Sequence, residues 1–182
     1  FPYVMGHNDS QENNVLVKHS EKLELVLIDV EYAGWNPMAF DLANYYAETM
    51  FENASKATET GTATFLENMM TEAETKEFAR AYLATYYEHY MPVEQKAAYD
   101  SFNSYVKEKL AIFVKQIYDC VLLDVFFWGV WSINLLKPTV DSCAPAVNKD
   151  FMNYTFAEAC VARFELVQKS MNKMNAIDGK DY

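Results

Sequence analysis

The residues best suited to chemistry lie close together near the start of the 182-residue chain. His7, Asp9 and Asn14 have the spacing H-x-D-x-x-x-x-N, which is the arrangement of a kinase catalytic loop. In such a loop the aspartate accepts the proton of the substrate hydroxyl and the asparagine holds magnesium. The three residues therefore predict phosphoryl transfer, with Asp9 as the base and Asn14 as a metal ligand.

A catalytic loop of this kind needs a second carboxylate to complete the magnesium site. Residues 25–28, Leu-Val-Leu-Ile, form an apolar run of strand length, and Asp29 follows directly. Asp29 thus stands at the end of a predicted strand, as the aspartate of a kinase D-F-G motif does. Asn14 and Asp29 are the predicted magnesium ligands.

The same residue types also have an ordinary structural use. Asp and Asn are common in turns, where their side chains hydrogen-bond to the nearby backbone. A short motif alone therefore does not decide function. The catalytic interpretation is favoured because the loop is followed, in order, by an apolar run that ends in an aspartate.

Two short strands are expected to hold these motifs side by side. Residues 15–17 and 25–28 are apolar, and a polar segment at residues 18–22 joins them. This pattern predicts a β-hairpin. The hairpin would bring Asn14 close to Asp29.

A helix is predicted to follow Pro37, because proline suits a first helical turn and apolar residues recur every three or four positions up to Met50. Asp41, Asn44 and Glu48 interrupt this apolar stripe. Their spacing places them along one edge of the helix. That edge is either a solvated face or one that faces the catalytic loop.

The rest of the chain is predicted to be mainly helical. Residues 53–64 are rich in Thr, Ala, Ser and Gly and predict an exposed loop. Charged and amide residues within the apolar segment 110–136 leave no run long enough to span a membrane, so a buried central helix is expected there. Helices are expected at residues 72–90 and 93–113 on either side of Met91-Pro92, at 110–136 ending at Lys137-Pro138, and, after a loop at 139–149, at 156–167.

Trp128 and Trp131 lie three positions apart, so they share one face of the predicted central helix. Most such pairs pack in a protein core. An aromatic face, that of Trp best of all, also attracts a quaternary ammonium ion. The residues alone leave both uses open.

Composition excludes several classes of function. The formal net charge of −11 and the pI near 4.7 argue against nucleic acid binding and weaken any interaction with anionic membranes. The 51% hydrophobic and 15% aromatic content predicts a folded globular domain. Three widely spaced cysteines form neither a disulfide framework nor a zinc pattern, which favours a reducing compartment such as the cytoplasm.

Taken together, the ordered motifs resemble those of the choline/ethanolamine kinase family. They are H-N-D-S-Q-E-N-N at 7–14, I-D-V-E-Y-A-G-W-N at 28–36, F-D-L-A-N at 40–44, F-W-G-V-W-S-I at 127–133 and A-R-F at 162–164. The resemblance covers most of the chain, with a weaker match over residues 54–110. It implies a mainly α fold with a short β-hairpin, the C-terminal lobe of a protein-kinase-like (aminoglycoside phosphotransferase-like) fold, over residues 1–182. The N-terminal nucleotide-gripping lobe is expected to be absent from this chain, since no glycine-rich loop occurs.

The resemblance implies ATP-dependent phosphorylation of the choline hydroxyl to phosphocholine, a step of phosphatidylcholine synthesis in the cytoplasm. It implies Mg²⁺ as the cofactor, choline or ethanolamine and ATP as partners together with the missing lobe of the same protein, and it allows a homodimer. The fragment alone is expected to be inactive. Neither a nucleic acid partner nor a membrane span is expected.

The resemblance also assigns roles to individual residues. Gln11 joins Asp9 and Asn14 in the catalytic set, and the supporting residues are His7, Glu31, Asp41 and Asn44. The implied choline pocket consists of Tyr32, Glu48, Trp128, Trp131 and Tyr154, with Glu48 opposing the charge of the substrate. Asn53 and Ala159 stand where family members commonly carry further aromatic residues, which weakens the preference for choline over ethanolamine.

Three alternatives stay open. The first is an ethanolamine kinase, and the second is another small-molecule phosphotransferase such as an aminoglycoside kinase, which shares the first two motifs. The third is a non-catalytic amine-binding module, motivated by the absent nucleotide lobe. The pair Trp128-x-x-Trp131 favours choline, and the retained acidic residues speak against a pure binding module.

Overall fold

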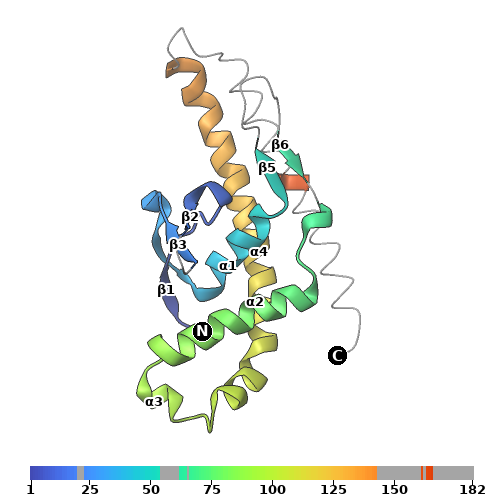
Figure 1. The fold of residues 1–182 in the computed structure, drawn as a ribbon. Helices are drawn as coiled ribbons and strands as arrows, with labels where there is room; N and C mark the ends of the chain where they lie inside the picture. The colour runs from blue at the N-terminus through green and yellow to red at the C-terminus, as the bar shows by residue number, and fades with distance from the viewer. Residues whose placement is uncertain (20–22, 54–61, 65, 143–160, 162, 166–182) are drawn as a thin grey trace. The chain divides into compact units, whose positions relative to one another are not determined.

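The computed structural model describes residues 1–19, 23–53, 62–64, 66–142, 161 and 163–165 (Figure 1). The chain divides into two compact units. The first unit comprises Phe1–Tyr46 and Met69–Cys120, and the second comprises Ala47–Asn68 and Val121–Tyr182. Each unit is described by itself below.

Two antiparallel strand pairs lie in the first unit. Strand β1 (Tyr3–Gly6) pairs with β4 (Gly34–Pro37), and Gly6 lies opposite Gly34. Strand β2 (Val15–Lys18) pairs with β3 (Glu24–Leu27), and Val15 lies opposite Leu27. The second pair is the hairpin that the sequence predicted.

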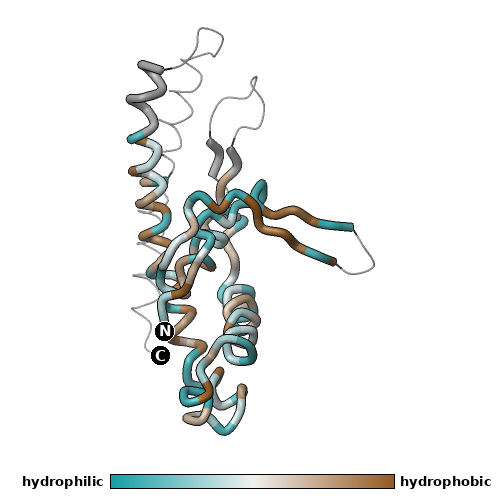
Figure 2. The backbone as a smooth tube through the Cα atoms, turned by 90° about the vertical axis from the view of Figure 1, so that its left-hand side faces the viewer, coloured by the Kyte–Doolittle hydropathy of each residue, from teal (hydrophilic) through white to brown (hydrophobic). Residues whose placement is uncertain are grey.

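The β2–β3 hairpin exposes apolar side chains on both of its faces. Figure 2 shows its two strands as mainly hydrophobic. Successive residues of a strand point to opposite faces, and neighbours such as Leu25, Val26 and Leu27 are each about half exposed. Within the described residues, therefore, neither face of the hairpin packs into a core.

Helix α1 (Met38–Glu48) follows β4 directly. Its apolar stripe is buried, since Met38, Leu42, Ala43 and Tyr46 are at most 3% exposed. Short 3₁₀ turns at Glu12–Asn14 and Val30–Tyr32 join the strands before it. The first of these turns contains Asn14 and so forms the end of the predicted catalytic loop.

Helix α2 (Glu72–Thr85) begins at a capping box, in which Thr71 and Glu74 each hydrogen-bond the backbone N–H of the other. It continues as a π-helical turn, Tyr86–Tyr90, and ends before Pro92 as predicted. The short helix α3 (Val93–Lys96) comes next, followed by the long helix α4 (Phe102–Ser142). Aromatic packing joins α2 to α4, with the rings of Tyr82 and Phe113 5.9 Å apart.

Two predicted helix boundaries are wrong. A single helix was expected over residues 93–113, but α3 ends at Lys96 and α4 begins at Phe102. Ser101 and Ser104 exchange hydrogen bonds there, each hydroxyl oxygen accepting from the backbone N–H of the other, and this starts a new helix. At the other end α4 runs past Pro138 to Ser142, because a proline kinks or interrupts a helix without always ending it.

Two other expectations also need correction. The segment 53–64 was predicted as a loop, but its two ends belong to strands, since β5 (Phe51–Asn53) and β6 (Thr62–Thr64) form an antiparallel pair, consistent with the preference of Thr for strands. Residues 54–61 lie outside the described residues. The central helix was predicted to be buried, yet α4 exposes an apolar stripe in the second unit: Leu123, Phe126, Phe127, Val130 and Ile133. A further 3₁₀ turn covers Leu66–Asn68. Of the last predicted helix, only residues 161 and 163–165 are described, and these are helical.

Candidate functional site

The predicted catalytic loop, His7 to Asn14, lies between β1 and β2 and ends in the 3₁₀ turn Glu12–Asn14. Its polar residues are unusually well buried for a loop, because His7, Asn8, Asp9 and Asn14 are each between 5% and 8% exposed. Buried polar groups need hydrogen-bond partners. The loop finds them in α1, in the segment 28–36 and within the loop itself.

Helix α1 anchors the first half of the loop. The Asp41 carboxylate accepts the backbone N–H of His7 at 2.9 Å and that of Asn8 at 2.6 Å. One turn later, the Asn44 side-chain oxygen accepts the backbone N–H of Ser10. Two of the three residues on the predicted polar edge, Asp41 and Asn44, therefore face the loop and hold its backbone.

Asn8 fixes the turn of the loop. Its φ of 64° is left-handed, a conformation that Asn tolerates better than most residues. The Asn8 amide donates to the carbonyl oxygen of Tyr32 at 2.8 Å, and its oxygen accepts from the Asn36 amide at 2.9 Å. A Cβ at Gly6 would lie 2.8 Å from this oxygen, so the close approach requires glycine. Sequence reasoning missed Gly6, Asn8 and Asn36, since their roles depend on contacts with distant residues.

The amide of Asn14 holds the carboxylate of Asp9. Asn14 Nδ2 donates to Asp9 Oδ2 at 2.8 Å and to the Asp9 carbonyl oxygen at 2.9 Å. The amide of Gln11 lies 3.5 Å from the same Asp9 oxygen, which is a long hydrogen bond. The predicted catalytic residues Asp9, Gln11 and Asn14 are thus brought together around one carboxylate.

The hairpin places Asp29 beside Asn14. The backbone N–H of Ile28 donates to the carbonyl oxygen of Asn14 at 3.0 Å, and His7 Nε2 donates to the carbonyl oxygen of Ile28 at 2.8 Å. Asp29 follows with φ 61°, a left-handed conformation that is uncommon outside glycine and clusters at functional sites. Of the two other residues predicted nearby, Glu31 is exposed and Tyr32 is half-buried, both in the turn after Asp29.

The donor set fits magnesium. Because Asn14 uses its amide nitrogen on Asp9, its side-chain oxygen is left to bind a cation, together with the carboxylate of Asp29. Within the described part of the chain, no group of three or more His, Cys, Asp or Glu side chains is placed to hold a metal. Mg²⁺ prefers oxygen ligands and is often held by one or two protein groups plus substrate phosphates and waters. Asn14 and Asp29 match that arrangement.

The second unit contains most of the described residues that were predicted to bind the amine. Trp128 and Trp131 lie together on α4, with ring centroids 5.2 Å apart and planes at 72°. Trp128 is 6% exposed. Tyr154 lies outside the described residues, and Tyr32 belongs to the first unit.

Glu48 has a partner that sequence reasoning did not supply. Arg163 Nη2 lies 2.7 Å from Glu48 Oε1, and the two side chains are only 8% and 12% exposed. The guanidinium carbon of Arg163 also lies 4.0 Å from the centroid of the Phe51 ring. Glu48 and Arg163 are 115 positions apart, so no local pattern could have indicated this pair.

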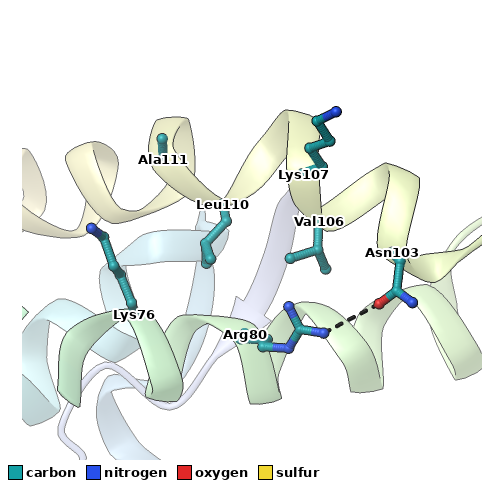
Figure 3. A pocket seen from close by; sticks show the side chains of 7 residues that line it. All are labelled: Lys76, Arg80, Asn103, Val106, Lys107, Leu110 and Ala111. Atoms are coloured by element: carbon teal, nitrogen blue, oxygen red, sulfur yellow. Dashed lines mark hydrogen bonds between the residues drawn. The ribbon is translucent and has the colours of Figure 1, made fainter. Parts of the chain in front are cut away.

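A hollow of about 460 Å³ lies between α2 and α4 in the first unit, and Figure 3 shows the side chains that line it. Three of its seven lining residues are cations: Lys76, Arg80 and Lys107. Arg80 donates to Asn103 across the hollow at 3.3 Å, and Lys76 pairs with Glu72. None of the predicted site residues lines it, so it is a packing groove between two helices that is separate from the catalytic loop.

The helices were also compared with the length and hydropathy of membrane-spanning helices. Among the helices in the described residues, none combines the length and the apolar character that crossing a bilayer requires.

The chain is similar to proteins of one family. The family model for choline/ethanolamine kinase matches residues 2–176. Mouse choline kinase alpha is 29% identical over 136 residues, covering 72% of this chain and 28% of the mouse protein. Human ethanolamine kinase 1 is 25% identical over 178 residues, covering 97% of this chain and 32% of the human protein. The chain thus spans less than half the length of these relatives.

The solved structure of a choline kinase from Cryptosporidium parvum Iowa II superposes with a TM-score of 0.68 at 23% identity. The match covers 97% of this chain and 40% of that one. The likeness confirms the predicted fold class, a mainly helical kinase-like fold with short hairpins.

Proposed function

The chain belongs to the choline/ethanolamine kinase family, and from this premise we propose that the whole protein transfers the γ-phosphoryl group of ATP to the hydroxyl of choline. The product is phosphocholine, and a role in phosphatidylcholine synthesis in the cytoplasm is part of the same proposal. The observation that carries it is the buried Asp9 carboxylate, held by Asn14 in a loop that Asp41 anchors. A pure amine-binding module would not need this arrangement.

In this mechanism Asp9 accepts the proton of the attacking hydroxyl, as the catalytic-loop aspartate of kinases does. The hydrogen bonds from Asn14, and the longer one from Gln11, orient its carboxylate. The loop is held before the substrate arrives, because its backbone is already bonded to α1. Positioning of this kind is a large share of phosphoryl-transfer catalysis.

Asn14 and Asp29 would hold Mg²⁺, and the ion would supply neutralisation of the charge on the nucleotide phosphates. Two interactions keep these ligands adjacent. They are the hydrogen bond from Ile28 to Asn14 and the bond from the His7 ring to Ile28. His7 is therefore a supporting residue in this proposal, and Glu31 stands in the turn that follows Asp29.

The trimethylammonium group of choline would bind the aromatic faces of Trp128 and Trp131, with Tyr32, Tyr154 and Glu48 completing the pocket. The paired indoles support this assignment, because a cation is attracted to an aromatic face by about 0.5–2 kcal/mol. The second candidate is ethanolamine. It is favoured by the match to human ethanolamine kinase 1, which extends over 97% of this chain.

Turnover by the whole protein tests the proposal. We would assay choline, ethanolamine and an aminoglycoside with Mg-ATP, using the wild type, Asp9→Asn and, as a matched control in the same loop, Glu12→Gln, since Glu12 is exposed. Choline should be phosphorylated best, and Asp9→Asn should lower kcat by about 10²- to 10⁴-fold because the general base is lost. Glu12→Gln should stay within a factor of a few.

Two results would contradict this function. Phosphorylation of the aminoglycoside without turnover of choline would overturn the substrate. An Asp9→Asn variant as active as Glu12→Gln would overturn the role of Asp9. Loss of activity on removal of magnesium with a chelator is expected, and full activity in its absence would remove Asn14 and Asp29 from the mechanism.

A further inference from the structure

The second unit contains a buried ion pair that includes Glu48, one of the residues predicted to bind the amine. Glu48 and Arg163 meet at 2.7 Å with side chains that are almost fully buried. Phe51 covers the guanidinium, whose central carbon lies 4.0 Å from the centroid of the ring. Arg163 therefore has a carboxylate on one side and an aromatic face on another.

The pair lies against the segment of α4 that carries the tryptophans. Phe164, the residue after Arg163, packs on Phe126 with ring centroids 5.8 Å apart. A Cβ at Gly129 would lie 3.2 Å from the Phe164 ring, so the helix backbone touches this ring directly. Trp128 is the neighbour of Gly129 in the sequence, so residues 163–164 are held against the same stretch of α4 that carries the tryptophans.

The pairing with Arg163 reduces the negative charge that Glu48 can present to an amine. A carboxylate that already binds a guanidinium is neutralised locally, and removing one partner of such a buried pair leaves an uncompensated charge. A primary ammonium carries three N–H donors and gains most from an acceptor with full charge. A trimethylammonium has no N–H and gains most from aromatic faces.

We propose that Arg163 is a specificity-determining residue that binds Glu48 and so favours choline over ethanolamine. This inference rests on the proposed function. With Glu48 held by Arg163, the pocket attracts its substrate chiefly through the rings of Trp128 and Trp131. Freeing Glu48 would add a charged acceptor that only the primary ammonium can use as a hydrogen-bond partner.

The ratio of kcat/KM for choline to kcat/KM for ethanolamine measures this role in the whole protein. Arg163→Met should shift the ratio at least tenfold toward ethanolamine. Arg163→Lys keeps a positive charge beside the Glu48 carboxylate and should shift the ratio much less. The matched control is Arg80→Met, because Arg80 is the other arginine of the sequence and lies on α2 in the first unit. That control should leave the ratio unchanged. A purely structural role of Arg163 would lower both kcat/KM values together and leave the ratio as it is, which would overturn the proposal.

A second variant decides the matter if Arg163→Met does not fold. The double variant Glu48→Gln/Arg163→Gln replaces the ion pair by two amides that can still hydrogen-bond to each other. The proposal expects it to prefer choline as strongly as the wild type, because the charge of Glu48 was already neutralised. A tenfold or greater change of the ratio in either direction would show that the charge of Glu48 already acts on the substrate in the wild type and would overturn the proposal. Failure of the wild type to phosphorylate either amine would instead overturn the proposed function itself.

Discussion

Single side chains outside the catalytic loop hold it mainly through its backbone. Asp41 is the clearest case, because one carboxylate accepts two adjacent N–H groups, those of His7 and Asn8. The residue lies 32 positions after Asp9, on a helix rather than in the loop. The motif at 40–44 is therefore part of the loop architecture, although it does not contact the reacting groups in the proposed mechanism.

Replacing Asp41 by Asn tests this anchoring role. An amide keeps one acceptor but turns its NH₂ group toward the second backbone N–H, so one buried donor loses its partner. We expect the free energy of unfolding to fall by about 1–3 kcal/mol, together with a lower kcat, measured by thermal unfolding and by choline turnover. Asp119→Asn is the control, since that carboxylate is half exposed and pairs with Lys115 on the surface. Equal stability of the two variants would show that Asp41 does not hold the loop.

Among the secondary-structure elements, a helix end is best predicted from local sequence where a side chain hydrogen-bonds to the backbone of the same helix or turn. The start of α2 is such a place. Thr71 Oγ1 accepts the backbone N–H of Glu74, and the Glu74 carboxylate accepts the backbone N–H of Thr71 at 2.8 Å. The hydrogen bonds from Thr71 lower the pKa of Glu74 below its usual value, although the side chain is exposed.

The capping box predicts how the stability of α2 depends on pH. Thr71→Ala should lower the free energy of unfolding by about 1 kcal/mol at pH 7. Because the pKa of Glu74 is lower in the folded state, its contribution is complete above the ordinary Glu pKa of about 4.3 and is lost as pH falls through the folded value. The difference between wild type and Thr71→Ala should therefore be smaller at pH 3 than at pH 7, as measured by denaturant unfolding. A difference that grows in acid would contradict this account.

For the whole molecule, the sequence predicted what depends on neighbours along the chain. The β2–β3 hairpin, the stripe of α1 and the end of α2 before Pro92 all follow from short patterns of apolar residues and breakers. The sequence left two alternatives for the helix edge that carries Asp41, a solvated face or a face toward the catalytic loop, and only the second implies that Asp41 anchors the loop. The pair of Glu48 with Arg163 could not be predicted, because 115 residues separate its members. Likewise, the pattern of α4 could not show that its apolar stripe would stay exposed.

The packing of the first unit makes a prediction at alkaline pH. Burial raises the pKa of Tyr46 and of Tyr105 far above the ordinary Tyr value of about 10. The unfolded chain would then lose these protons near pH 10 while the folded chain keeps them. The stability that results is complete below pH 10 and is lost as the pH rises above it.

Alkaline unfolding should therefore be cooperative and coupled to tyrosine ionisation. Titration of the protein from pH 8 to 12, followed by tyrosinate absorbance and by circular dichroism, should show some of the tyrosines ionising only as the helical signal is lost. Tyr46→Phe keeps the ring that packs on Tyr118 at 6.0 Å but removes one buried hydroxyl, so its unfolding midpoint should move to higher pH. Tyr3→Phe, at an exposed position, should leave the midpoint in place. If all tyrosines ionised before any helix was lost, the hydroxyls of Tyr46 and Tyr105 would have to be open to solvent, and the packing of α1 and α2 on α4 would need revision.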